Sequence, residues 1–215
     1  MNEREFVNAT LLKATGKAKT LQPGDTKYNK IVSIGNLMIA VWENEPTVDW
    51  ASLYDDRYDI GSTGTTRRYD IPEEVRKFSG TPGDYVVVKT DGTERYFTVI
   101  AGDQLTQHEG GDYCAKVGDS LVFTTDLPAG GSILAPVYLY AEKLNGPNSE
   151  ILIDNPLWLV IASAGEYARN DVMAAGQYGN LVAEANSLME KMIENNRGQY
   201  TSANLGIIPR VSGGF

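Results

Sequence analysis

The longest apolar run in the C-terminal half of the chain lies in DNPLWLVIASA, residues 154–164. Asparagine followed by proline is a typical helix start, because the amide side chain caps the first turn and proline needs no backbone partner there. The residues that follow, 157–162, are apolar on every side of a helix. A bilayer span needs about 20 apolar residues, so this run is far too short to cross a membrane. The stretch therefore predicts a central, buried helix.

Helical patterns also occur on both sides of this stretch. Residues 6–12 place apolar side chains at helical spacing, and Gly16 is a typical C-terminal stop. An apolar stripe over about 27–44 predicts a second helix, and residues 177–196 form a clearly amphipathic one. The tryptophans in these helical parts are expected to anchor the core; they are Trp42, Trp50 and Trp158.

The period of the apolar residues changes between about residues 55 and 145. Short strand-like runs alternate there with glycine turns; they are residues 85–88, 96–100, 113–117, 120–125 and 133–140. Asp91-Gly92 joins the first two runs, and Asp-Gly in that position is a strong hairpin signal. Residues 72–76 are expected to form one helical turn. The region predicts a small antiparallel sheet or partial barrel.

The order of helices, strands and helices predicts an α+β fold. We expect a helical bundle formed by residues 1–54 and 150–197, with an inserted β domain over 55–149. Residues 198–215 are expected to form an extended C-terminal tail. This segment contains glycine and proline, which disfavour a regular helix, together with apolar side chains that can order on a partner. The apolar residues are Leu205, Ile207, Ile208, Pro209, Val211 and Phe215.

Composition limits the possible functions. Hydrophobic residues make up 42% of the 215 residues and the mean hydropathy is −0.28, which indicates a folded chain rather than a disordered one. With one cysteine and one histidine, an intrachain disulfide is impossible and a Cys/His zinc site would lack ligands. The net charge of −9 disfavours a protein that grips nucleic-acid phosphates. The N-terminus lacks a signal-peptide pattern, so we expect the protein to stay in the cytoplasm where it is made.

Catalytic signatures are scarce. His108 and Cys114 could form a base and nucleophile pair, but an exposed loop histidine and a buried strand thiol are the favoured interpretation, because neither lies in a catalytic motif. Residues 61–66, GSTGTT, lack the lysine of a phosphate loop. The adjacent carboxylates at 55–56 and 73–74 do not face each other on a regular element. We therefore predict no catalytic, cofactor-binding or metal-binding residues, and a protein that is not an enzyme.

Two C-terminal segments resemble virion structural proteins of tailed bacteriophages: DNPLWLVIASAGEYA, residues 154–168, and YGNLVAEANSLM, residues 178–189. In layout the chain is similar to the head-to-tail adaptor (connector) proteins, including the tail tubular protein A type of short-tailed phages. The N-terminal part fits the same plan, with a short helix and then a helix that closes on Trp42. The strand region departs most from that plan.

The resemblance implies a homo-oligomeric ring of twelve copies, a dodecamer, below the portal protein at the head–tail junction of the virion. Such a ring extends the DNA channel, lets DNA pass without specific binding, and offers a platform for tail assembly to a downstream tail or nozzle protein. Residues 198–215 would dock on the portal. The protein would be made in the host bacterial cytoplasm and would need no cofactor or membrane. The apolar circumference of residues 157–162 fits this picture, because neighbouring subunits could cover what a small bundle leaves exposed.

Two alternatives remain open. The strand region is compatible with another virion component, such as a tail terminator, tail tube or capsid accessory protein. Aromatic side chains in the strands are compatible with a hydrolase or a glycan-binding module, although tyrosines in strands more often serve packing; these are Tyr85, Tyr96, Phe97, Tyr113, Tyr138 and Tyr140.

Overall fold

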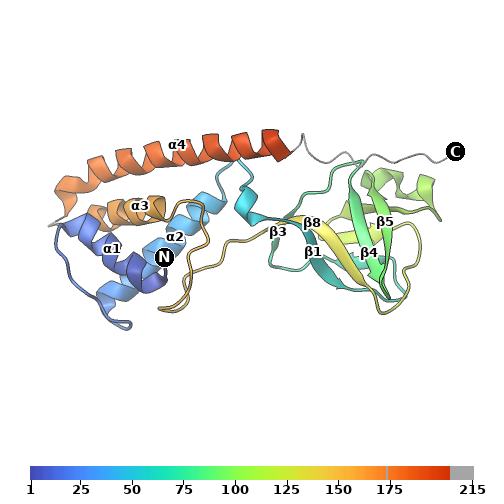
Figure 1. The fold of residues 1–215 in the computed structure, drawn as a ribbon, viewed down its shortest axis with the longest axis horizontal. Coiled ribbons are helices and arrows are strands. Elements are labelled where there is room, and N and C mark those ends of the chain that lie inside the picture. The colour runs from blue at the N-terminus through green and yellow to red at the C-terminus, as the bar shows by residue number, and fades with distance from the viewer. Residues whose placement is uncertain (173, 204–215) are drawn as a thin grey trace. The chain divides into compact units, whose positions relative to one another are not determined.

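The computed structural model describes residues 1–172 and 174–203, with side chains described up to residue 197. The chain divides into two compact units: a helical unit, Met1–Ser52 with the chain from Ala141 onward, and a sheet unit, Leu53–Tyr140. The α-helices lie in the first and the strands in the second, so the fold is α+β (Figure 1). Residues 141–149 belong to the helical unit, although the predicted β domain extended to residue 149.

The helical unit is built around one central helix. The α-helices are α1 (Glu3–Thr15), α2 (Thr26–Glu43), α3 (Pro156–Arg169) and α4 (Tyr178–Ala203), with short 3-10 turns η1 (Ala51–Leu53) and η3 (Ala175–Gln177). Helices α1, α2 and α4 each pack against α3. The predicted central helix is confirmed. Helix α4 continues to Ala203, beyond the predicted start of the tail at residue 198.

The covering of α3 corrects one expectation. Its residues from Trp158 to Ile161 are buried, and so are the small residues Ser163, Ala164 and Gly165. Only Leu157, in the first turn, is an exposed large apolar residue of this helix. The expectation that a small bundle would leave part of this helix for neighbouring subunits to cover is therefore wrong, because α1, α2 and α4 of the same chain already bury it.

The helix ends follow from local side chains. Asn2 and Glu5 form a reciprocal capping box at the start of α1, with hydrogen bonds of 2.9 and 3.0 Å. Gly16 ends this helix at φ 68°, a left-handed conformation that favours glycine. The Leu157 N–H donates to Asn155 Oδ1 at the start of α3, as the Asn-Pro pair predicts.

The segment that re-enters the helical unit is held by polar side chains of α1 and α2. Glu3 is 3% exposed; its Oε1 accepts from Tyr28 Oη at 2.8 Å and its Oε2 accepts from Gly146 N at 3.0 Å. Desolvation, with the bond to Glu3, raises the pKa of Tyr28 to about 12, so its hydroxyl remains a donor. Asn36 exchanges two hydrogen bonds with the backbone of Leu144. These bonds explain why residues 141–149 lie with the helices.

A second set of contacts fixes the segment before the sheet unit. Asn196 of α4 is 3% exposed; its side chain accepts from Ala51 N and donates to Asp49 O, each at 2.8 Å. Trp50 stacks on Trp42 with ring centres 5.0 Å apart, and its Nε1 donates to Trp42 O. Together with the burial of Trp158, these contacts confirm the tryptophans as core anchors.

The sheet unit is a single curled sheet, a half-barrel (Figure 1). Its strands follow the order β1-β8-β4-β5-β6-β7-β2, and β3 also pairs with β8. Their bounds are β1 (Tyr54–Ser62), β2 (Arg68–Asp70), β3 (Val75–Phe78), β4 (Tyr85–Thr90), β5 (Thr93–Val99), β6 (Tyr113–Val117), β7 (Ser120–Phe123) and β8 (Ser132–Leu139). One pair, β5 with β6, is parallel and is connected through the 3-10 helix η2 (Gly102–His108), so the predicted all-antiparallel pairing is wrong at this point.

The predicted hairpin at Asp91-Gly92 is confirmed, and β6 and β7 form a second hairpin. Asp91 (φ 47°) and Gly92 (φ 80°) form the two-residue turn between β4 and β5. Gly118 (φ 62°) lies in the turn between β6 and β7. The helical turn predicted over residues 72–76 is wrong: Val75 N donates to Pro72 O, and the chain then pairs with β8 as strand β3.

Replacing the buried Asn196 by alanine should destabilise the helical unit by about 1–3 kcal/mol, because its hydrogen bonds to the half-buried Ala51 N–H and Asp49 C=O would be lost. The three tryptophans all lie in the helical unit, so their fluorescence during urea unfolding reports this unit alone. Asn195→Ala, an exposed neighbour on α4, is the matched control and should change the stability little. Equal stability of the two variants would contradict the prediction.

Gly35→Ala should also destabilise this unit, by roughly 1–3 kcal/mol, because a Cβ atom would lie 2.7 Å from Phe6 Cε1 and 2.9 Å from Leu144 Cδ1. Gly179→Ala meets no atom within 4 Å in α4 and should instead raise helix stability by up to about 1 kcal/mol. Opposite shifts of the tryptophan-detected urea midpoint are expected. Stabilisation by Gly35→Ala would contradict this prediction, because it would mean that Phe6 and Leu144 can move away from the new Cβ atom without loss of stability.

Candidate functional site

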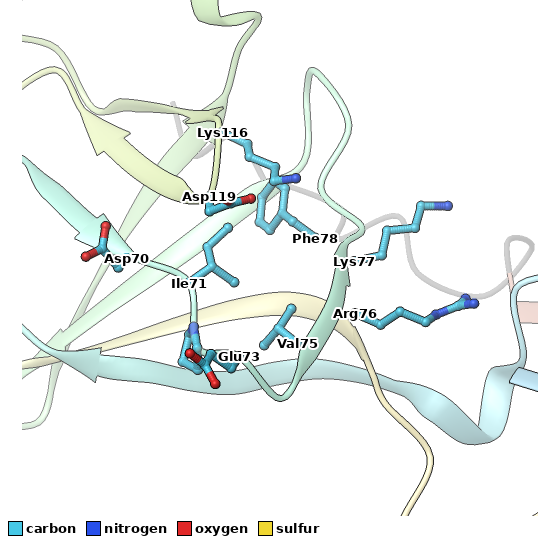
Figure 2. A pocket seen from close by; sticks show the side chains of 10 residues that line it. Asp70, Ile71, Glu73, Val75, Arg76, Lys77, Phe78, Lys116 and Asp119 are labelled. Atoms are coloured by element: carbon cyan, nitrogen blue, oxygen red, sulfur yellow. The ribbon is translucent and has the colours of Figure 1, made fainter. Parts of the chain in front are cut away.

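A pocket of 430 Å³ opens in the sheet unit (Figure 2). It lies between strand β3, the connection from β2 to β3, and the hairpin of β6 and β7. Its lining combines apolar and charged side chains: Ile71, Pro72, Val75 and Phe78, with Asp70, Glu73, Arg76, Lys77, Lys116 and Asp119. Its size falls within the range of about 300–1,000 Å³ that is typical of ligand sites.

The path of the chain creates this pocket. Strand β2 pairs with β7 at the end of the sheet order, whereas β3 pairs with β8 near the other end. The few residues between β2 and β3 therefore have to cross the opening of the half-barrel. Ile71 N donates to Asp119 O at 2.9 Å, which fixes the first part of the crossing on the β6–β7 hairpin. The turn at Pro72 then directs the chain to β8.

The floor of the pocket is continuous with the core of the sheet unit. Phe78 is 8% exposed and belongs to the buried cluster that contains Phe97 and Phe123. Ile71 and Val75 are half-buried and pack against the same cluster. Because these side chains are held from behind by a packed core, the floor offers a preformed apolar surface.

Charges of both signs surround this floor. Figure 2 shows Arg76 and Lys77 extending to one side of β3, with Asp70 on the opposite side and Glu73 between them. Lys116 and Asp119 lie beside Phe78. Asp70 Oδ1 accepts a hydrogen bond from Ser120 Oγ at 2.8 Å, which orients that carboxylate. The lining of the pocket thus combines an apolar floor with charged side chains of both signs.

The sequence-based candidates for catalysis are not brought together as a reactive pair. Cys114 is fully buried and its Sγ lies 3.9 Å from Phe97 O; burial raises the pKa of this thiol to about 12, so the thiolate is scarce at neutral pH. His108 is half-buried because its ring packs on Tyr113, with centres 4.4 Å apart. The buried thiol is confirmed, and the histidine is less exposed than predicted.

The GSTGTT segment has a structural role. Thr63 Oγ1 accepts from Gly131 N at 2.8 Å and donates to Pro128 O at 2.5 Å, which ties the end of β1 to the loop before β8. Arg67 forms ion pairs with Glu109 and Asp126, and Arg68 donates to Ser120 Oγ. These arginines are engaged within the chain and do not converge on an anion site.

The strand aromatics divide into two groups. Phe97 and Tyr138 are buried and Tyr113 is half-buried, which confirms a packing role for them. Exposed positions belong to Tyr85, Tyr96 and Tyr140. The rings of Tyr85 and Tyr96 meet edge to face at 6.2 Å, and Tyr96 Oη donates to Glu94 Oε2 at 2.9 Å.

Two further properties concern the described residues. Across 1–172 and 174–203, no three His, Cys, Asp or Glu side chains lie together in a way that could hold a metal ion. None of the helices in this part combines the length and the hydropathy that a membrane span requires. The predicted docking residues of the tail lie outside the described residues; they are Leu205, Ile207, Ile208, Pro209, Val211 and Phe215.

Sequence reasoning did not find the pocket. Its lining comes from residues 70–78 and 116–119, which meet only because β2 and β3 pair with different strands. Strands of three and four residues give too short a pattern to recognise. In comparisons with known proteins, the chain matches no family model and no curated protein.

Proposed function

We propose that the protein is a virion structural protein of a tailed bacteriophage, the head-to-tail adaptor. In this role it forms a homo-oligomeric ring below the portal at the head–tail junction, extends the DNA channel and receives the next tail protein. The observation that carries the proposal is the division of the chain. Both ends of the chain contribute helices to one unit, and a complete sheet unit is inserted between them.

The helical unit, as a bundle, is the ring-forming part in this proposal. Since α3 is covered within the chain, ring contacts must come from other surfaces. Leu37 and Val41 lie one turn apart on the outer face of α2 and are 54% and 49% exposed. A closed ring uses two different faces of each subunit, and an exposed apolar pair suits one of them.

The charge of the chain supports passage of DNA without binding. The sheet unit contains 14 Asp and Glu against 8 Lys and Arg, and the whole chain carries −9. Phosphate contacts dominate the affinity of proteins for DNA, so an acidic surface next to a channel keeps DNA from adhering.

The sheet unit is the platform for the downstream tail or nozzle protein in this proposal. Its preformed pocket and its exposed Tyr85 and Tyr96 give it surface features that a partner can recognise. The same tyrosine pair also favours a second candidate, a glycan-binding module, because exposed aromatic rings stack on sugars. A glycan array without signal would remove that candidate. Labelling within a virion would separate the adaptor from a tail terminator, tail tube or capsid accessory protein.

Mixing the purified chain with its portal should give a ring on the portal, seen by electron microscopy and native mass measurement. Leu37→Asp with Val41→Asp should abolish the ring yet keep the monomer folded, because the charges would be buried at the subunit contact. Thr20→Asp, which adds charge at another exposed site, should keep the ring. A wild-type chain that stays monomeric with the portal contradicts the proposal.

Deletion of residues 204–215, which begins after the last residue of α4, should leave the helical unit folded and abolish docking on the portal. Tryptophan fluorescence reports folding, and co-sedimentation with the portal reports docking. If the shortened chain loses its cooperative unfolding, these residues belong to the core instead. If it still docks, the portal contact lies elsewhere.

A further inference from the structure

We propose that Asn145-Gly146 is a self-modification site, at which the folded chain converts Asn145 into an aspartate or isoaspartate and releases ammonia. Two side chains act in this reaction: the Glu3 carboxylate is the base, and the Ser149 hydroxyl is the hydrogen-bond donor. The site lies in the segment that re-enters the helical unit. The inference goes beyond the adaptor role and does not depend on it.

The first support is the residue pair itself. Asn145 and Gly146 form the only Asn-Gly pair in the sequence, and Asn145 is exposed. The backbone nitrogen of the following residue can attack the side-chain amide carbon of an asparagine and close a succinimide ring. Glycine in the following position favours this attack, because it has no Cβ atom to obstruct the close approach of the backbone.

The second support is that the turn carrying this pair is held in place. Ser149 N donates to Gly146 O at 2.8 Å, which closes the turn. The first turn of α1 fixes it from outside, since Glu3 N donates to Ser149 O at 2.9 Å and Arg4 N donates to Pro147 O at 3.3 Å. Reacting groups that the fold already positions do not have to be ordered during the reaction.

The third support is the base. Glu3 Oε2 accepts from Gly146 N at 3.0 Å, within the reach of about 2.6–3.2 Å that a general base needs from the group it deprotonates. The carboxylate is 3% exposed, and its other oxygen accepts from Tyr28 Oη at 2.8 Å. Glu3 is therefore directed at the nitrogen that has to lose its proton before it can attack.

The fourth support is the donor on the opposite side of the reaction. Ser149 Oγ donates to Asn145 Oδ1 at 2.7 Å. When the Gly146 nitrogen bonds to Asn145 Cγ, negative charge develops on this oxygen. A hydrogen-bond donor that is already in position stabilises such a charge and so lowers the barrier.

The reaction balances with water as the only other reactant. Glu3 takes the proton of Gly146 N as this nitrogen bonds to Asn145 Cγ. The bond between Cγ and Nδ2 of Asn145 then breaks, and the nitrogen leaves as ammonia with the proton that Glu3 returns. Water opens the succinimide at one of its two carbonyl groups, which gives either aspartate or isoaspartate.

The product changes the segment that re-enters the helical unit. Isoaspartate adds one methylene group to the backbone between Leu144 and Gly146. Both neighbours are hydrogen bonded to helices, Leu144 to Asn36 and Gly146 to Glu3. The lengthened backbone cannot keep both sets of bonds unchanged, so the modified chain should unfold at a lower urea concentration than the fresh chain, as tryptophan fluorescence would measure.

The test incubates the full chain at neutral pH and physiological temperature, folded or unfolded in urea, and follows Asn145 by peptide mapping with mass spectrometry. The folded wild type should react faster than the unfolded chain. Folded Glu3→Gln, which keeps the shape of the side chain, should react at least ~10-fold more slowly than the folded wild type. In urea the two should react at the same rate, because Glu3 is brought to Gly146 only by the fold.

Further variants and an internal control sharpen the comparison. Ser149→Ala should slow the folded chain by roughly 3–10-fold, and Ser149→Thr should restore the rate. Gly146→Ala should prevent the modification and leave the fold intact, because the new Cβ atom would meet only Ser149 Oγ, at 3.8 Å. Asn148 lies in the same turn but precedes serine, so it should remain unmodified.

Two outcomes would overturn the inference. A folded wild type that reacts more slowly than the unfolded chain would mean that the hydrogen bonds to Glu3 and Ser149 protect Asn145. A folded Glu3→Gln variant that reacts as fast as the folded wild type would remove the base. Ring formation on the portal is measured separately, so failure of the adaptor role and failure of this reaction are distinguishable.

Discussion

The structure depends on the hydrogen bonds that hold two segments without regular secondary structure. One lies where the chain leaves the helical unit, and the other lies where it returns to that unit. Backbone groups of such segments need partners when water is excluded. Side chains from the helices supply them: Asn196 bonds to residues 49–51, Glu43 accepts from Ala141 N at 2.8 Å, and Glu3 accepts from Gly146 N. These hydrogen bonds hold residues 49–51 and 141–146 on the helical unit. The residues between them can therefore form a separate core, the sheet unit.

The same polar residues explain why the boundary between the units was the weak part of the sequence-based prediction. Glu3 and Glu43 are buried in helices, and Asn196 lies in the buried stripe of α4, although their residue types are typical of exposed faces. A periodicity argument therefore assigns them to solvent. Residues 141–149 look like a loop of the β region, and only the bonds to Asn36 and Glu3 place them with the helices.

Local signals were sufficient elsewhere. Asp91-Gly92 has the backbone angles that a two-residue hairpin requires, and Asn155-Pro156 starts α3. Strand β1 was missed because it buries little: of its nine residues, YDDRYDIGS, only Ile60 is fully buried, and its pairing with β8 holds it in place. The candidate pocket was missed for a related reason, since its floor and rim come from segments that approach only through distant pairing.

The central helix shows how an apolar pattern can be overinterpreted. A helix that is apolar on every side has to be buried, but its sequence does not show whether the same chain or another subunit buries it. In α3 small residues let the neighbouring helix approach closely: a Cβ atom on Gly165 would lie 3.5 Å from Leu181 Cβ of α4. With this close packing, α1, α2 and α4 are enough to bury α3. In the proposed adaptor, self-assembly would use surface that folding leaves exposed, such as Leu37 and Val41 on α2. Because the chain has two compact units, the proposed ring contact on α2 and the sheet unit draw on different residues.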